Sequence, residues 1–296
     1  MAVYERSYRP FVGPRTPTAG RWRVVARYAL ADQWGSRVFL ASLVVALTLP
    51  VIAALIIYLR HNASLLSLLQ VDVSQLLDID GEFFLAGVLV PQQWAALWMT
   101  LLVGPRLITA DLAAGALPLY LARPLTRRTY VLGKAAALVG LLSAITWIPG
   151  LLLWGLQASL EGPGWAAENL RLAGALLGAS WTWILILSCL SLALSAWVRW
   201  RPVAQLFLLG MLTVPTGFAR AVNEILELDR DWAVLFSPTD LLTVTRAGLF
   251  GDTVHSWAYI DLPDLPLASA WLAVALLCAA CLLLLTLKVK AFEVVR

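Results

Sequence analysis

Residues 104–134 read GPRLITADLAAGALPLYLARPLTRRTYVLGK, a basic and proline-punctuated stretch between two long apolar runs. Its middle, Thr109–Leu121, carries apolar residues at helical spacing and predicts a short helix. This helix should end before Pro124, which cannot continue it and which biases Arg123 toward an extended conformation. A new apolar helix follows. The stretch is therefore predicted to be a helical connector between two membrane spans.

The composition identifies the class of protein. Hydrophobic residues make up 60% of the chain, charged residues make up 14%, and the mean hydropathy is +0.80. Soluble domains average about 25% charged residues, so we predict an all-α integral membrane protein. A helix needs about 20 apolar residues to cross a bilayer. Six runs meet that need: Val38–Leu59, Phe84–Pro105, Tyr130–Gln157, Leu172–Val198, Val203–Ala219 and Leu265–Leu287.

The distribution of charge predicts the orientation. Most Lys and Arg residues lie in the N-terminal segment, in the connectors after the second and fourth runs, and in the C-terminal tail, whereas acids gather in the alternate connectors. Positive connectors stay in the cytoplasm, so we expect a multi-pass protein with both termini cytoplasmic. The high Ala, Leu, Arg and Trp content suggests a bacterial inner (cytoplasmic) membrane. The net charge of +4 follows from this bias and requires no nucleic-acid partner.

The N-terminal part, residues 1–37, is predicted to be a cytoplasmic arm followed by an interfacial helix. From Trp22 to Trp34 apolar and polar residues alternate at helical spacing. Val25 and Ala29 belong to the face that can meet lipid, so the helix should lie in the membrane interface. A cytoplasmic extension of the first span is the alternative.

The remaining part, residues 38–296, is predicted to be the six-span transmembrane domain, with the coupling connector at residues 105–134. Its outer segment, residues 220–264, should contain short outer helices between the fifth and sixth spans. The first is the amphipathic piece Arg220–Leu228, and the second begins at Ser237 as an N-cap, with a proline in its first turn.

Two features of the apolar runs predict local structure. Gln92 and Gln93 lie well inside the second run, where amides need partners, so a bond to another helix and a hydrated substrate path are both open. Pro149 and Gly150 should break and kink the third run.

The chain carries no recognisable catalytic chemistry. Away from their ends the apolar runs contain no Asp, Glu, Lys, Arg or His, which argues against a proton- or sodium-coupled carrier. His61 and His255 have no cluster around them, so no metal site is predicted. Gly133-Lys134 is followed by Ala135 and lacks an earlier glycine, so it is no phosphate-binding loop. We predict no catalytic residue and no bound cofactor, and the energy for active transport would come from another chain.

The connector resembles the cytoplasmic signature of ABC (ATP-binding-cassette) exporter permeases of the second type. That family shows an acid, a glycine, a leucine-rich turn, Arg-Pro-Leu-Ser/Thr-Arg and a late Gly-Lys in this order, with an interfacial (elbow) helix, six spans and two short outer helices. The matching positions are Asp111, Gly115, Leu117, Leu119, Leu121, Arg123, Pro124, Leu125, Thr126, Arg127, Tyr130, Gly133 and Lys134. The chain departs from the family at Asp111–Ala114, where Glu and charged residues are usual, and at Ala116, where Thr is usual.

The resemblance implies an exporter permease that pairs with a second permease copy, identical or similar, and with two copies of an ABC ATPase subunit that binds ATP and Mg. The helix around Asp111–Leu121 would be the coupling helix, seated in a groove of the ATPase. The residues implied in coupling are Asp111, Gly115, Leu119, Arg123, Pro124, Arg127 and Arg128. Positive-inside topology alone is the alternative for these arginines. The substrate would pass between two copies of the first, second and fifth spans, which makes Gln92, Gln93 and Pro215 the path candidates.

Two other functions stay open on the sequence. One is a secondary carrier or channel, and the other is an ATP-driven subunit that works an extracytoplasmic partner through the outer segment without transport. A path lined by apolar side chains and a few amides favours lipids, lipid-linked molecules, peptides or hydrophobic drugs over free ions.

Overall fold

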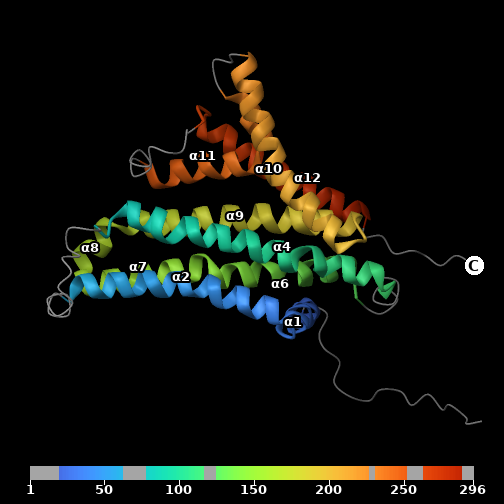
Figure 1. The fold of residues 1–296 in the computed structure, drawn as a ribbon, viewed down its shortest axis with the longest axis horizontal. Helices are drawn as coiled ribbons and strands as arrows, with labels where there is room; N and C mark the ends of the chain where they lie inside the picture. Colours follow the sequence, from blue (N-terminus) through green and yellow to red (C-terminus); the bar gives the residue numbers. More distant parts are fainter. Residues whose placement is uncertain (1–19, 63–77, 117–124, 227–230, 252–262, 289–296) are drawn as a thin grey trace, which may run out of the picture.

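The computed structural model describes residues 20–62, 78–116, 125–226, 231–251 and 263–288. Within these ranges every regular element is a helix, as predicted (Figure 1). In chain order they are α1 (Arg21–Trp34), α2 (Arg37–His61), the π-helix η3 (Phe83–Leu89), α4 (Val90–Ala113), α6 (Arg127–Ile145), α7 (Trp147–Glu161), α8 (Pro163–Glu168), α9 (Leu170–Trp197), α10 (Arg201–Leu226), the 3-10 helix η4 (Trp232–Phe236), α11 (Pro238–Phe250) and α12 (Leu267–Lys288).

Six helical stretches are long and apolar enough to cross a membrane. They are α2, η3 with α4, α6 with α7, α9, α10 and α12. Each contains most of one predicted run, so the prediction of six potential spans is confirmed. The chain has the architecture of a multi-pass helical membrane protein.

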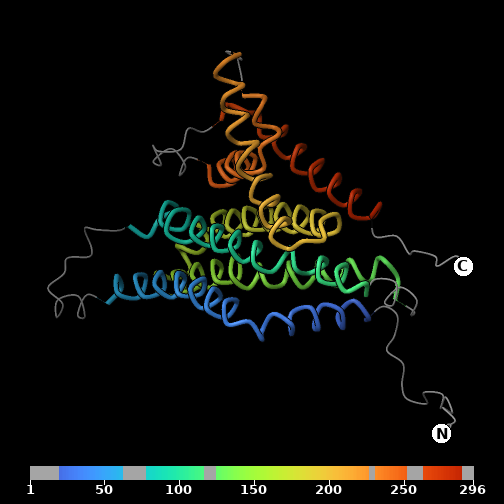
Figure 2. Tube along the Cα trace, turned by 45° about the vertical axis from the view of Figure 1, so that its right-hand side comes forward, coloured from blue at the N-terminus to red at the C-terminus, as the bar shows by residue number. Residues whose placement is uncertain are grey.

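Five helices, α2, α4, α6, α7 and α9, run side by side and form a bundle that lies across the page in Figure 1. At its centre α9 packs against α4, α6, α7, α11 and α12, and most of its side chains are buried. α10 leans away from the bundle in both views (Figures 1 and 2). We name the end of the bundle at which α1 lies the α1 end, and the opposite end, which carries α8, the α8 end.

The third run is broken, as predicted, and the break lies at Thr146, between α6 and α7, three residues before Pro149. Pro149 has no N–H to donate to the carbonyl of Ile145, and its ring crowds that carbonyl. The helix therefore breaks before the proline, which is accepted in the first turn of α7. Thr146 stays hydrogen-bonded, because its Oγ1 donates to the carbonyl of Leu142 at 2.7 Å.

The second run does not end at Pro105, and this prediction is wrong. α4 continues to Ala113, so the first part of the predicted short helix, from Thr109, belongs to α4, while its residues 117–121 lie outside the described residues. Pro105 cannot donate to the carbonyl of Leu101. Gln205 Nε2, on α10, donates to that oxygen at 2.8 Å instead. Because a neighbouring helix supplies the missing donor, α4 runs on through the proline.

The fifth run also continues further than predicted. α10 reaches Leu226 with Pro215 inside it, so the start of the piece Arg220–Leu228 is not a separate outer helix. The buried residues Leu208, Leu212 and Ala219 recur at helical spacing on one face, which carries the helix past the proline.

The second outer helix is confirmed as α11. Ser237 Oγ accepts from the backbone N–H of Asp240 at 3.3 Å, which is the predicted N-cap. The helix ends at Gly251, whose φ of +66° is unfavourable for other residues.

Candidate functional site

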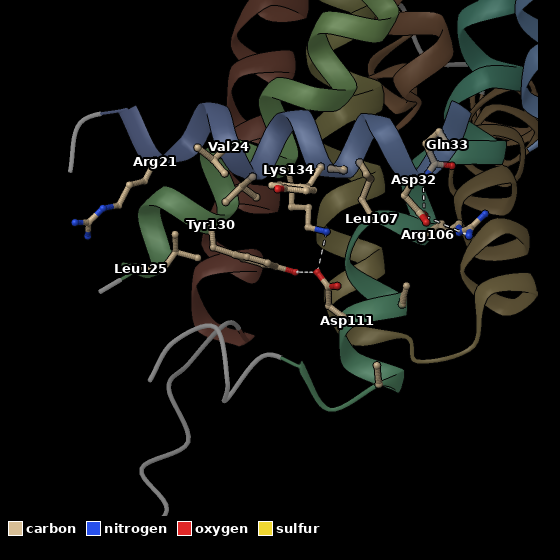
Figure 3. A pocket seen from close by; sticks show the side chains of 15 residues that line it. Arg21, Val24, Asp32, Gln33, Arg106, Leu107, Asp111, Leu125, Tyr130 and Lys134 are labelled. Atoms are coloured by element: carbon tan, nitrogen blue, oxygen red, sulfur yellow. Dashed lines mark hydrogen bonds and ion pairs between the residues drawn. The ribbon is translucent and has the colours of Figure 1, made fainter. Parts of the chain in front are cut away.

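A cleft of about 820 Å³ lies at the α1 end, between α1, the last turns of α4 and the first turns of α6. Figure 3 shows its side chains. Apolar groups such as Val24 and Leu107 line much of it, and Asp111 and Lys134 face each other across its floor. The cleft therefore joins the predicted interfacial helix to both ends of the connector.

Three polar side chains on the floor form what we name the Asp111 cluster: Asp111, Tyr130 and Lys134. Asp111 Oδ2 lies 2.8 Å from Lys134 Nζ, and it accepts a hydrogen bond from Tyr130 Oη at 2.6 Å. The Asp111 and Lys134 side chains are only 15% and 12% exposed, and Tyr130 is fully buried. A carboxylate in this setting is neutralised by a cation and hydrogen-bonded at one oxygen, so its charge is compensated.

The positions of the cluster residues follow from helix geometry. Tyr130 and Lys134 are one turn apart on α6, so both side chains lie on one face. Asp111 sits in the last turn of α4, where the helix dipole disfavours an anion. The positive charge of Lys134 offsets both the negative charge of Asp111 and the negative end of the α4 dipole. The cluster thus fixes the end of α4 against the start of α6.

α1 is held against α6 by a close contact at Gly133. A Cβ at this position would lie 2.5 Å from Val25 Cβ and 2.8 Å from the carbonyl oxygen of Trp22. Only glycine leaves room for α1 at this distance. Val25 and Ala29 therefore face the protein, and the prediction that they face lipid is wrong.

α1 is a separate helix and not an extension of the first span. It appears end-on in Figure 1, where α2 runs across the page. Ser36 begins α2 as an N-cap, accepting from the N–H of Phe39 at 3.4 Å. A second link joins α1 to α4 at the rim of the cleft, where Asp32 Oδ2 lies 3.3 Å from Arg106 Nη2. This pair is half-exposed and contributes little to stability.

The structure places the other predicted coupling residues near this cleft or outside the described residues. Gly115 follows α4 with a φ of +61°. Arg127 and Arg128 lie exposed in the first turn of α6, which Thr126 caps, and no acid within the described residues pairs with either. The remaining three, Leu119, Arg123 and Pro124, lie outside the described residues.

The path candidates lie in different surroundings. Gln93 is buried between helices: its Oε1 accepts from Arg246 Nη1 at 3.0 Å, and its backbone carbonyl accepts from Trp183 Nε1 at 2.9 Å. Gln92 is buried towards Gly150 of α7, and neither amide atom has a hydrogen-bond partner among the described residues. Pro215 is half-buried within α10. The structure places Gln92 and Gln93 in the bundle core on α4, and Pro215 on a different helix.

Sequence reasoning missed two groups of residues. Gln205 and Arg201 of α10 donate to the carbonyls of Leu101 and Leu102, at 2.8 and 3.1 Å. The sequence signal for the Gln205 contact was Pro105, because a proline inside a helix leaves the carbonyl four residues earlier without its backbone donor. Arg246 was counted only as an outer charge, although it is buried.

Comparison with known proteins adds no family. No family model matches the chain, and no curated protein matches it significantly. Within the described residues no group of three or more His, Cys, Asp or Glu side chains could hold a metal ion. The fold and composition define the chain as a helical multi-pass membrane protein, and its particular function must be argued from its site.

Proposed function

We propose that this chain is the permease subunit of an ATP-driven exporter. The α1 end would face the cytoplasm, in the bacterial inner membrane, and two copies of a soluble ATPase subunit would bind there. A second permease copy would complete the transport unit. This chain would bind no nucleotide, and its part would be to convert movement of the ATPase into movement of its spans.

The observation that carries the proposal is the Asp111 cluster with its neighbour Gly133. These residues come from both ends of the signature that resembles exporter permeases, and they meet in one joint beneath α1. Asp111 and Lys134 form a nearly buried ion pair, while Gly133 seats α1. A joint of this kind is what a coupling element requires, because a push on the connector moves α4, α6 and α1 together.

The contacts of α4 suggest how such movement would pass to the path. Pro105 lies between the cluster and the bundle core. Because it cannot donate to the carbonyl of Leu101, Gln205 of α10 donates to that oxygen instead. A displacement of the end of α4 would therefore pull on α10, one of the three spans expected to line the path. The exposed Arg127 and Arg128 at the start of α6 are suited to bind acids on the ATPase.

Purification of the tagged chain from its native cells tests the proposal. We expect a stoichiometric soluble partner with a phosphate-binding loop, and ATPase activity that depends on this chain. Arg127→Glu with Arg128→Glu should release the partner by like-charge repulsion. Arg171→Glu, an exposed charge reversal at the α8 end, is the matched control and should leave it bound. A chain that transports without any ATPase, or that loses its partner equally in both variants, would refute the proposal.

A further inference from the structure

Arg246 of α11 is buried, which is unusual for an arginine. Its side chain reaches α4, where Nη1 donates to Gln93 Oε1 at 3.0 Å, and the residue is only 9% exposed. Gln93 is itself 4% exposed, and Trp183 holds its backbone through a hydrogen bond at 2.9 Å. The contact is therefore fixed from the side of α4.

The two side chains leave hydrogen-bond donors unused. A guanidinium has five N–H donors and no acceptor, and one of those of Arg246 is engaged by Gln93. The Nε2 of Gln93 is buried and has no acceptor in the described part of the chain. The buried Nε2 of Gln93 thus lies beside a guanidinium whose other N–H groups have no acceptor among the described residues.

Among the residues that the structure describes, no carboxylate compensates this charge. In the part of the chain that the structure describes, no acid lies within ion-pair distance of Arg246. Asp240, on the same helix, is buried and lies 3.4 Å from Arg220 instead. Burial lowers the pKa of Arg246, but an arginine titrates so far above neutral pH that it remains charged.

A purely structural tie between α11 and α4 would not need a charge. A neutral amide could accept or donate the same hydrogen bond without placing a cation in a poorly solvating environment. α11 is in any case packed closely on its other neighbours: Leu249 lies against Gly178 of α9, and Leu267 of α12 lies against Gly248. The charge therefore requires another explanation.

We propose that Arg246 and Gln93 form a recognition site for an anionic group, phosphate or carboxylate, on an amphiphilic substrate. This inference rests on the proposed function and narrows its substrate class. The guanidinium and the amide N–H₂ would bind two oxygens of the anion, as guanidinium forks do. The apolar body of the substrate would lie along the apolar helices. An entering anion would replace the single hydrogen bond by which Arg246 of α11 reaches Gln93 of α4.

Binding to the purified chain, without any ATPase, tests the site directly. The probes are hexadecyl phosphate, hexadecanol with the same tail but no charge, and inorganic phosphate, each added to the full chain in a non-ionic detergent. Hexadecyl phosphate should bind saturably and raise the Tm, whereas hexadecanol should do neither. Equal binding of hexadecanol would overturn the proposal. Equal affinity for inorganic phosphate would identify a free anion as the ligand and would overturn the proposal that the substrate is amphiphilic.

Substitution then assigns the binding to Arg246. Arg246→Gln should weaken binding of hexadecyl phosphate by about tenfold or more, and Arg246→Lys, which keeps the charge without the fork, should weaken it less. Arg171→Gln is the control, because it removes an exposed charge near the end of α11, and it should leave the affinity unchanged. Equal affinity of wild type and Arg246→Gln would contradict the site.

The unliganded Tm excludes a structural role. If Arg246 is kept for a ligand, Arg246→Gln should leave the Tm unchanged or raise it, because a buried uncompensated cation is removed. A clear fall in Tm together with lost binding would make Arg246 a structural strut and overturn the proposal. These measurements use no ATPase, so their failure leaves copurification of the partner as an independent test of the exporter.

Discussion

The Asp111 cluster and the Arg246–Gln93 site are both polar groups enclosed by apolar helices, and they differ in how their charge is balanced. In the cluster, one carboxylate faces one ammonium at 2.8 Å and accepts a phenol hydrogen bond as well. In the site, the one partner that the described part of the chain offers the guanidinium is a neutral amide. A balanced group stabilises the structure that contains it, whereas an unbalanced one leaves binding capacity for a molecule that is not part of the chain.

The difference also separates two kinds of movement. The cluster joins helix ends at the α1 end and should move as one piece, because opening it would expose a nearly buried ion pair. The contact of Arg246 with Gln93 is a single hydrogen bond between α11 and α4, which an incoming anion could replace. The comparison therefore predicts opposite effects of removing charge in the two regions.

The largest effect is expected from breaking the Asp111 cluster. Lys134→Met should lower the free energy of unfolding by about 3 kcal/mol, since it leaves Asp111 charged and without a cation. The measurement is denaturant unfolding in mixed micelles, followed by tryptophan fluorescence. In contrast, Arg246→Gln should leave the free energy of unfolding of the unliganded chain unchanged or raise it.

A double variant separates charge balance from lost packing. Asp111→Asn combined with Lys134→Met removes both charges, so it should recover a large part of the stability that Lys134→Met loses. A double variant as unstable as the sum of its single variants would show that the two side chains do not act as a pair.

A smaller effect is expected where α1 meets α6. Gly133→Ala places a Cβ against Val25 and the carbonyl of Trp22, which should cost about 1–3 kcal/mol through overpacking. Gly140→Ala on the same helix is the matched control, because no atom lies within 4 Å of its Cβ. It should stabilise α6 by up to about 1 kcal/mol through helix propensity. If both variants behaved alike, α1 would not be seated at Gly133.

Much of this fold could be predicted from the sequence because it depends on local properties. The six apolar runs and the N-cap at Ser237 each follow from composition or from a few neighbouring residues. The spacing of Tyr130 and Lys134 likewise places them on one face of α6. What these side chains face could not be predicted, since it depends on where α4 ends.

The missed features all depend on partners far apart in the chain. α4 continues through Pro105 because Gln205 donates to the carbonyl of Leu101, which the proline leaves free and which lies 104 residues earlier in the chain. Arg246 is buried because it reaches Gln93, which precedes it by 153 residues. Charge counting placed Arg246 among outer residues, and only the packing of α11 on α9 turns it inward. The sequence contains the polar groups, but not the pairing that decides their role.

The contact between Gln205 and α4 should give an effect of about 1 kcal/mol. Gln205→Leu leaves the carbonyl of Leu101 without a donor. The expected loss of stability is the usual free-energy cost of one unmade hydrogen bond. Pro105→Ala restores an N–H within α4 and should make Gln205 dispensable. In the Pro105→Ala background, Gln205→Leu should therefore cost clearly less free energy of unfolding. An equal cost in both backgrounds would mean that Gln205 acts by packing alone, and that α4 and α10 are not joined through the proline.

The smallest effect is expected at the rim of the cleft, where Asp32 and Arg106 form an ion pair with side chains that are 61% and 34% exposed. Asp32→Asn should lower the free energy of unfolding by about 0.5 kcal/mol or less, because solvent screens an exposed pair. In about 1 M salt the difference from wild type should vanish, since charges are then screened within about 3 Å. The loss in Lys134→Met should persist in the same salt, because the Asp111 cluster is shielded from solvent. If both losses disappeared together, the cluster would be no better enclosed than the rim, and the proposed rigid joint would lose its physical basis.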